Sequence, residues 1–174
     1  MTQGSNIVLI GMPGAGKSSL GVVVAKELGY DFTDIDLVIQ HKYGKVLADL
    51  VEELGPEGYI EIENEALCEC DCEHSIIATG GSAVYSAEGM AHMKELGLVV
   101  YLKAPVEELA ERIGEMHQRG VIVRPGVEPK LEAIFADREP LYEQYADLTV
   151  ETSGTPQDAV EEIVAALQAD GSIC

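Results

Sequence analysis

The chain has 174 residues, 31 of them acidic and 11 basic, so its formal net charge at pH 7 is −20. A field of this sign repels nucleic acids and anionic membrane surfaces, and we expect neither as a partner. The hydrophobic share of 47% and the length suit one globular domain with its own core. No run of 18 apolar residues is present, and the N-terminal segment lacks the basic start of a secretion signal. We therefore expect a cytoplasmic protein that works as a monomer.

Short apolar runs that predict strands alternate with helical patterns along the chain. Strands are expected at residues 7–10, 30–33, 75–78, 98–102 and 148–151. Helices are expected at residues 19–28, 37–42, 46–54, 58–68, 87–96, 105–114, 130–145 and 156–168. This alternation is typical of parallel sheets covered on both faces, so we expect a three-layer α/β/α fold with a five-stranded parallel sheet. Ligands bind such sheets at the carboxyl ends of the strands.

The segment GMPGAGKS, residues 11–18, directly follows the first expected strand and leads into the first expected helix. It matches the phosphate-loop pattern G-x-x-x-x-G-K-[ST] in the context that the pattern needs. Its glycines allow backbone N–H groups to face an anion, Lys17 would reach the β- and γ-phosphates, and the Ser18 hydroxyl would bind Mg²⁺. The alternative is an ordinary glycine-rich turn. The residues predicted to bind a nucleotide here are Gly11, Gly14, Ala15, Gly16, Lys17, Ser18 and Ser19.

Polar residues also follow the second and third expected strands. Asp34 and Asp36 could divide two tasks, one near Mg²⁺ and the other accepting the proton of an acceptor hydroxyl. The alternative is that one of them caps the helix that follows. Gly80, Gly81 and Ser82 come after the third strand, at the same expected edge of the sheet. The chain lacks the N-K-x-D motif that reads guanine, which disfavours a GTPase.

The region of residues 115–129 departs from the alternating pattern. Gly120 and the pair Arg124-Pro125 interrupt helix formation there. Such a segment beside a nucleotide site predicts a mobile lid.

Three of the four cysteines lie close together, at Cys68, Cys70 and Cys72, with His74 next to them. Four such side chains could bind a metal ion, although zinc sites more often use C-x₂₋₄-C pairs. The alternative, which we favour, is the end of a helix with reduced thiols.

The sequence resembles the shikimate kinase family over nearly its whole length. The matching segments are 11–18, 32–36, 78–81, 124–125, 138–142 and 146–147. The resemblance implies ATP-dependent transfer of a phosphoryl group to shikimate, giving shikimate 3-phosphate, with Mg²⁺ as cofactor. It also implies that Lys17 contacts the phosphates and that Asp34 acts near the metal.

The same resemblance assigns roles on the acceptor side of the site. Asp36 would bind the acceptor hydroxyl as the candidate base, Gly80 and Gly81 would offer backbone N–H groups, and Arg138 would bind the acceptor carboxylate. Residues further along the chain complete the implied set: Arg124 as a catalytic lid arginine that reaches the transferring phosphate, and Arg112 and Pro156 beside adenine.

Three positions differ from the family pattern. Ile60 stands where the family has a second arginine for the acceptor carboxylate, and an aliphatic side chain cannot replace a bidentate, charge-assisted pair. Ser82 replaces a third glycine, which is tolerable only if its φ is negative. Gly126 and Val127 replace two leucines of the lid.

These differences leave two acceptors open. Shikimate is the first candidate, since the rest of the pattern is kept. The alternative is another small hydroxy acid or amino acid such as homoserine, whose ammonium would face the glutamates at positions 57, 61 and 63 around Ile60. Two further alternatives are that another base, such as Arg119, supplies the missing contact and that these glutamates simply face solvent. A nucleotide-binding regulator without catalysis is the hypothesis from a different class.

Overall fold

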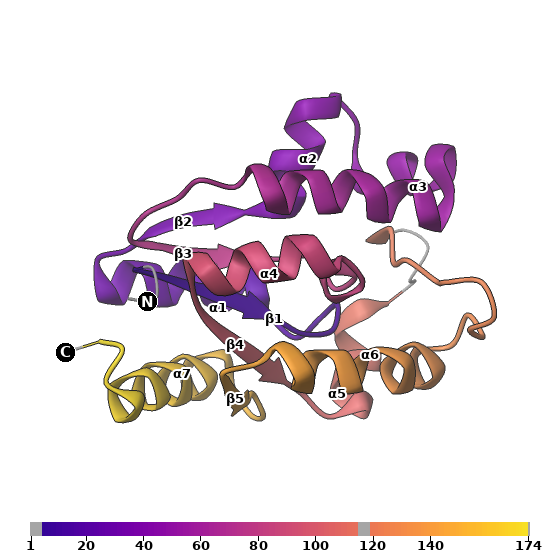
Figure 1. The fold of residues 1–174 in the computed structure, drawn as a ribbon. Helices are drawn as coiled ribbons and strands as arrows, with labels where there is room; N and C mark the ends of the chain where they lie inside the picture. The colour runs from indigo at the N-terminus through magenta and orange to yellow at the C-terminus, as the bar shows by residue number, and fades with distance from the viewer. Residues whose placement is uncertain (1–4, 115–118, 174) are drawn as a thin grey trace.

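In the computed structural model, which describes residues 5–114 and 119–173, five parallel strands form one sheet (Figure 1). They are β1 (Asn6–Ile10), β2 (Asp31–Asp34), β3 (Ser75–Ala78), β4 (Gly97–Lys103) and β5 (Leu148–Glu151), in the spatial order β2-β3-β1-β4-β5. Val8 of the central strand lies opposite Ile77 on one side and Val99 on the other. All residues of β1 and β3 are buried, as expected for strands covered on both faces.

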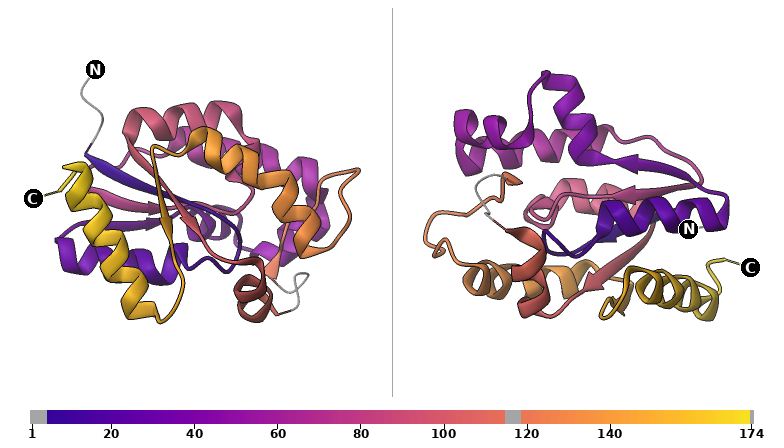
Figure 2. Two further views of the ribbon diagram at one scale, coloured as in Figure 1. Left: turned by 90° about the horizontal axis from the view of Figure 1, so that it is seen from below. Right: turned by 180° about the vertical axis from the view of Figure 1, so that it is seen from behind.

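Helices cover both faces of this sheet. They are α1 (Lys17–Leu28), α2 (Ile35–Tyr43), α3 (Leu47–Glu69), α4 (Ala87–Leu96), α5 (Val106–Ile113), α6 (Leu131–Tyr145) and α7 (Pro156–Asp170), with a short 3₁₀ helix η1 (Ala83–Tyr85). Figure 2 shows α1 and α7 on one face of the sheet and α4 and α6 on the other. The predicted three-layer α/β/α fold with its five-stranded parallel sheet is confirmed.

Some helix boundaries differ from the predicted ones, and they do so where a glycine adopts a positive φ. Gly16, in the left-handed conformation with a φ of 93°, precedes a helix that begins at Lys17 rather than at residue 19. The two helices expected at 46–54 and 58–68 lie within α3, which is broken by non-helical Gly55 with a φ of 71°. Pro56 follows directly, where a missing N–H is tolerated because it begins a new helical turn.

The strand directions determine where a site can form. Because β1, β2 and β3 are parallel neighbours, the phosphate loop, Asp34 and Gly80 all follow strands that end at one edge of the sheet. Within the described residues, none of the helices combines the length and the apolar character needed to cross a membrane.

Candidate active site

The phosphate loop between β1 and α1 encloses the side chain of Lys17. Its Nζ donates hydrogen bonds to Gly11 O at 2.7 Å and to Met12 O at 2.8 Å. Gly14 has a φ of 82°, in the left-handed region that favours glycine. Burial lowers the pKa of Lys17 to about 8. The loop therefore holds an ammonium at the start of α1, where backbone N–H groups favour a bound phosphate.

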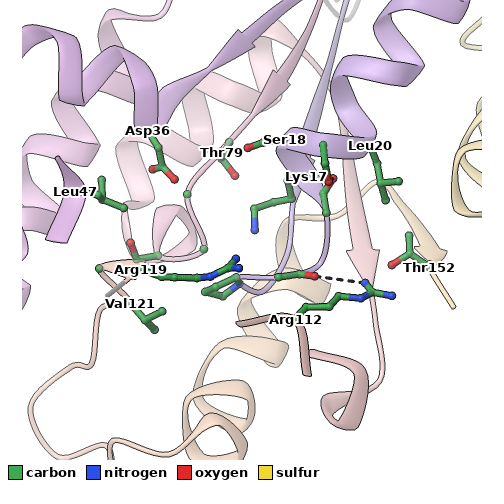
Figure 3. Close-up of a pocket in the computed structure, with 18 of the residues that line it drawn as sticks. Lys17, Ser18, Leu20, Asp36, Leu47, Thr79, Arg112, Arg119, Val121 and Thr152 are labelled. Carbon is green, nitrogen blue, oxygen red and sulfur yellow. Dashed lines mark hydrogen bonds between the residues drawn. The ribbon is translucent and has the colours of Figure 1, made fainter. Parts of the chain in front are cut away.

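A cavity of about 690 Å³ lies at this edge of the sheet, a volume that suits small-molecule ligands (Figure 3). Lys17, Asp36 and Arg119 extend into it from different parts of the chain (Figure 3). The predicted site residues in its wall are Gly14, Gly16, Lys17, Ser18, Ser19, Asp36, Gly80, Gly81, Ser82, Arg112, Arg138 and Pro156. The predicted site residues outside the wall are Gly11, Ala15, Asp34, Ile60 and Arg124.

Ser18 and Asp34, the two predicted metal ligands, contact each other. The Ser18 hydroxyl donates to Asp34 Oδ2 at 2.6 Å. The other oxygen, Asp34 Oδ1, accepts from Leu37 N at 3.2 Å and so caps α2. The capping alternative is therefore correct for Asp34, and it leaves the second oxygen beside Ser18.

Asp36 lies in the first turn of α2 and faces the cavity. Desolvation, with a smaller contribution from the neighbouring Asp34 carboxylate, raises the pKa of Asp36 to about 6. The Tyr59 hydroxyl donates a long hydrogen bond of 3.5 Å to Asp36 Oδ1. The carboxylate thus keeps acceptor capacity toward the cavity.

Glu63 is a second carboxyl group in the cavity wall, from the segment of α3 after the kink. It is 0% exposed, and its Oε1 accepts a hydrogen bond from the Ser82 hydroxyl at 2.6 Å. Burial, followed by repulsion from Asp36, raises the pKa of Glu63 to about 8. Ser82 has a φ of −89°, so the serine in place of glycine is accommodated without backbone strain.

Arg138 of α6 is only 1% exposed, although it is charged. Nη2 donates to Ile122 O at 2.6 Å and Nε donates to the Tyr85 hydroxyl at 3.2 Å. A Cβ placed on Gly81 would lie 2.8 Å from Nη1, so this nitrogen is immediately beside the glycine turn. Two of its nitrogens are thus fixed by the protein, and the residue lines the cavity wall.

Arg124, predicted to reach the transferring phosphate, is not at the cavity. Its Nε and Nη2 donate to the two carboxylate oxygens of Asp137 at 3.1 and 2.9 Å, and its guanidinium lies 4.1 Å above the Tyr85 ring. Arg119 lines the cavity instead (Figure 3). The predicted role of Arg124 therefore has no support from its position, and both arginines belong to an irregular segment in which spacing does not reveal direction. Residues 115–118 of this predicted lid lie outside the described residues.

The far end of the cavity contains Arg112, Thr152 and Pro156. Arg112 Nη1 donates to Gly14 O at 3.4 Å, and Nη2 pairs with Glu108 at 2.8 Å, so the side chain lies across the phosphate loop. Thr152 is 1% exposed, and its hydroxyl has no hydrogen-bond partner among the described residues. This end therefore offers a hydroxyl that is free to form a hydrogen bond, in a wall that also includes Arg112.

Ile60 does not line the cavity but packs, partly buried, against the core. Glu57 and Glu61 are exposed, so the solvent-facing alternative is correct for these two. Glu63 alone of the three glutamates faces the cavity.

The cysteine segment does not form a metal centre within the described residues. Cys70 and Cys72 are 3.5 Å apart at sulfur, Cys68 is exposed, and His74 stacks on Tyr30 at 3.9 Å. The favoured interpretation, a helix end with free thiols, agrees with this geometry.

One cavity is thus lined by a phosphate loop, by the carboxyl groups of Asp36 and Glu63, and by the buried Arg138. This combination defines a P-loop kinase of small metabolites.

A family model described as "Shikimate kinase" matches residues 13–168. The chain is 38% identical over 172 residues to shikimate kinase 2 of Serratia proteamaculans, covering 97% of each chain. It is 37% identical to the shikimate kinase of Francisella tularensis subsp. novicida, covering 94% of each.

A solved structure supports the same assignment. The shikimate kinase from Acinetobacter baumannii in complex with shikimate matches with a TM-score of 0.86 and 33% identity, covering 97% of this chain and 95% of that one. The chain therefore belongs to the shikimate kinase family, as its motifs predicted, and it is an ATP-using kinase.

Sequence reasoning missed several residues of the cavity wall, notably Tyr59, Thr152 and Leu47. It named Glu63 and Arg119 only as alternatives and not as main site residues. A signal for Glu63 was present, because Tyr59, Glu63, Ala66 and Leu67 follow the helical spacing of a buried face. A glutamate on such a face is a candidate functional group.

Proposed function

We propose that the enzyme transfers the γ-phosphoryl group of ATP to a hydroxyl of a small carboxylate, with shikimate as the first acceptor to test and shikimate 3-phosphate as the product. One observation carries this proposal: Lys17, Asp36 and Arg138 line the same cavity. These residues supply a phosphate contact, a proton acceptor and a carboxylate contact, respectively. The names of the relatives favour shikimate among small carboxylates.

The phosphate loop would bind the donor. Lys17 exchanges its bonds to Gly11 O and Met12 O for bonds to the β- and γ-phosphates, while the α1 N-terminus offers backbone N–H groups. Arg112 and Pro156 flank the adenine at the far end of the cavity. The Thr152 hydroxyl is available there to bond a ring nitrogen.

Ser18 and Asp34 fit a Mg²⁺ ion, because both present oxygen atoms, which are the ligands that this hard cation prefers. Bound Mg²⁺ would neutralise charge on the phosphates. The side chains would hold it directly or through water, with Asp34 fixed in place by its capping bond to Leu37 N.

The transfer itself follows from the position of Asp36. The acceptor hydroxyl oxygen forms a bond to the γ-phosphorus, the bond from that phosphorus to the β–γ bridging oxygen breaks, and ADP leaves. The hydroxyl proton passes to the Asp36 carboxylate and from there to solvent. Arg138 orients the acceptor through its carboxylate, so that positioning supplies much of the catalysis.

Arg119 takes the role first predicted for Arg124, stabilising the charge on the transferring phosphoryl group. Its position in the cavity wall supports this assignment. Gly120 lies against the start of α3, since a Cβ there would be 3.1 Å from Ala48 N. The predicted lid would thus cover the cavity from the side of α3 and limit hydrolysis of ATP by water.

The test is an assay of ADP release with product detection, run with shikimate, gluconate and related hydroxy acids. Shikimate-dependent ADP release with a phosphorylated product supports the proposal. ATP binding without transfer to any acceptor would contradict it and favour a nucleotide-binding regulator. Asp36→Asn provides the control, since it should bind ATP and fail to transfer.

A further inference from the structure

Cys70 and Cys72 form a pair of thiols that the proposed reaction does not use. Their sulfur atoms are 3.5 Å apart, and both thiols are free. The pair lies between the end of α3 and the start of β3, and neither cysteine lines the cavity. Because the cavity forms where the strands end, the thiols are at the opposite edge of the sheet. They therefore offer a chemistry that is separate from phosphoryl transfer.

Hydrogen bonds to the backbone hold the two thiols together. His92 Nε2, from α4, donates to Cys70 O at 2.8 Å, and Asn6 Nδ2, from β1, donates to Cys72 O at 2.6 Å. Separating the two cysteines would break one of these bonds. The formation of an S–S bond, which is about 2 Å long, thus starts from two sulfur atoms that are already in contact.

The two thiols differ in their access to solvent. Cys70 is 9% exposed, whereas Cys72 is only partly buried. Burial is also the largest of the causes that raise the pKa of Cys70 to about 12, so this side chain remains a thiol at neutral pH. Cys72 is therefore the sulfur that a molecule from solvent meets first, and Cys70 is in place to react next.

The surroundings of the pair are acidic. Three exposed acidic residues flank the two cysteines along the chain: Glu69, Asp71 and Glu73. Glu69 is paired with Lys42 at 2.9 Å, while Asp71 lies between the cysteines in sequence. The net charge of −20 for the whole chain has the same sign. Such a field attracts a cationic reagent and repels an anionic one.

We propose that Cys72 and Cys70 form a redox-active dithiol that small cationic disulfides oxidise, with Cys72 as the attacking sulfur and Cys70 as the resolving one. The Cys72 thiolate attacks one sulfur of the reagent, whose S–S bond breaks, and the first small thiolate leaves and takes up a proton. Cys70 then gives its proton to solvent and attacks Cys72 Sγ, which expels the second small thiolate. The two protein thiols are oxidised to one disulfide, and the reagent is reduced to two thiols.

The experiment uses a background that carries Cys68→Ser and Cys174→Ser, so that only the pair can react. The folded protein is treated with cystamine, which carries two ammonium groups, or with oxidised glutathione, which is anionic. Mass spectrometry after alkylation counts the free thiols and detects any bound reagent, and thermal melting verifies that the protein is folded. We expect a product without free thiols and without bound reagent, from which dithiothreitol restores both thiols.

Single substitutions in this background assign the two roles. Cys70→Ser should stop the reaction at the mixed disulfide on Cys72, because the resolving sulfur is missing. Cys72→Ser should react at least about tenfold more slowly than Cys70→Ser, since the remaining thiol is buried and has little thiolate character. Cystamine should react about tenfold faster than oxidised glutathione at low ionic strength, and added salt should narrow this difference.

Three results would contradict the proposal. Failure of both reagents to oxidise the folded pair would remove the site itself. A mixed disulfide that persists while Cys70 is present, or equal rates for the two variants, would overturn the assigned roles. Oxidised glutathione that reacts as fast as cystamine at low salt would overturn the preference for cationic disulfides. All three are independent of which acceptor the enzyme phosphorylates, so the proposed function is tested separately.

Discussion

Arg124 and Asp137 form a bidentate ion pair that ties the segment after Arg119 to α6, with contacts of 3.1 and 2.9 Å. Tyr85 joins this pair to Arg138, the residue proposed to bind the acceptor carboxylate. Its hydroxyl donates to Asp137 at 2.5 Å and accepts from Arg138 at 3.2 Å. Arg124 is therefore linked to Arg138 through Asp137 and Tyr85.

The two arginines of this segment should differ sharply when each is replaced by alanine. Arg119→Ala should lower kcat by about 10²–10³, the usual effect of removing a group that stabilises transition-state charge. Arg124→Ala should change kcat much less, and stability by under about 1 kcal/mol because the pair is partly exposed. Steady-state kinetics and thermal melts measure both effects. A larger loss of kcat in Arg124→Ala would restore the original prediction.

Tyr85→Phe should weaken acceptor binding selectively. The variant keeps the ring beneath Arg124 but removes the hydroxyl that fixes Arg138 and Asp137. Loss of one such bond should raise the acceptor KM about two- to tenfold, with the ATP KM unchanged. Tyr101→Phe is the matched control, because the buried Tyr101 hydroxyl has no partner among the described residues. An equal rise in the KM values for acceptor and ATP would instead indicate that the substitution disturbs the whole site.

Asp36→Asn should separate chemistry from nucleotide binding. An amide has the shape of the carboxylate but cannot take the hydroxyl proton, so kcat should fall by about 10²–10⁴. ATP affinity, measured by calorimetry, should stay within a few-fold of the wild type. Retained kcat would show that the acceptor proton leaves by another route.

Glu63 should make the protein less stable as the pH rises. Its folded-state pKa of about 8 lies above the usual value of 4.5 for a glutamate, so the folded state binds more protons between these two values. The free energy of unfolding should therefore fall from about pH 5 to pH 8. Glu63→Gln should reduce this decline, leaving the smaller part that Asp36 contributes below about pH 6. Melting temperatures measured from pH 5 to 9 give both profiles, and identical profiles would contradict the assignment.

Much of the fold was predictable because local signals and topology agree. The strands at 75–78 and 148–151 and the helix at 87–96 have the predicted bounds. Glycines such as Gly29 and Gly44, both left-handed, end helices where the sequence indicated. The order of strands could not be predicted from propensity, since it depends on which crossovers bury the sheet.

The site was predictable only where a motif has a rigid geometry. The phosphate loop has a rigid geometry, and so do the short turns after β2 and β3. The choice between Arg119 and Arg124 depends on whether Asp137 captures one of them, a contact between residues that no periodicity relates. The same applies to Glu63, whose unpaired oxygen becomes evident only when α3 is packed against Gly80.

The distribution of charge around the cavity changes how a nucleotide reaches it. The wall includes Lys17, Arg112, Arg119 and Arg138, four of the 11 basic residues of the chain, beside only two of its 31 acidic ones. At low ionic strength the net charge of −20 repels an approaching anion over long distances, whereas the attraction of these four cations acts only at short range. Salt shortens the Debye length, to about 8 Å at physiological ionic strength, and so weakens the long-range repulsion first. Added salt should therefore quicken the capture of ATP, the reverse of the usual behaviour of an anion site. ATP would therefore reach the cavity by short-range encounter with these cations and not by long-range electrostatic steering.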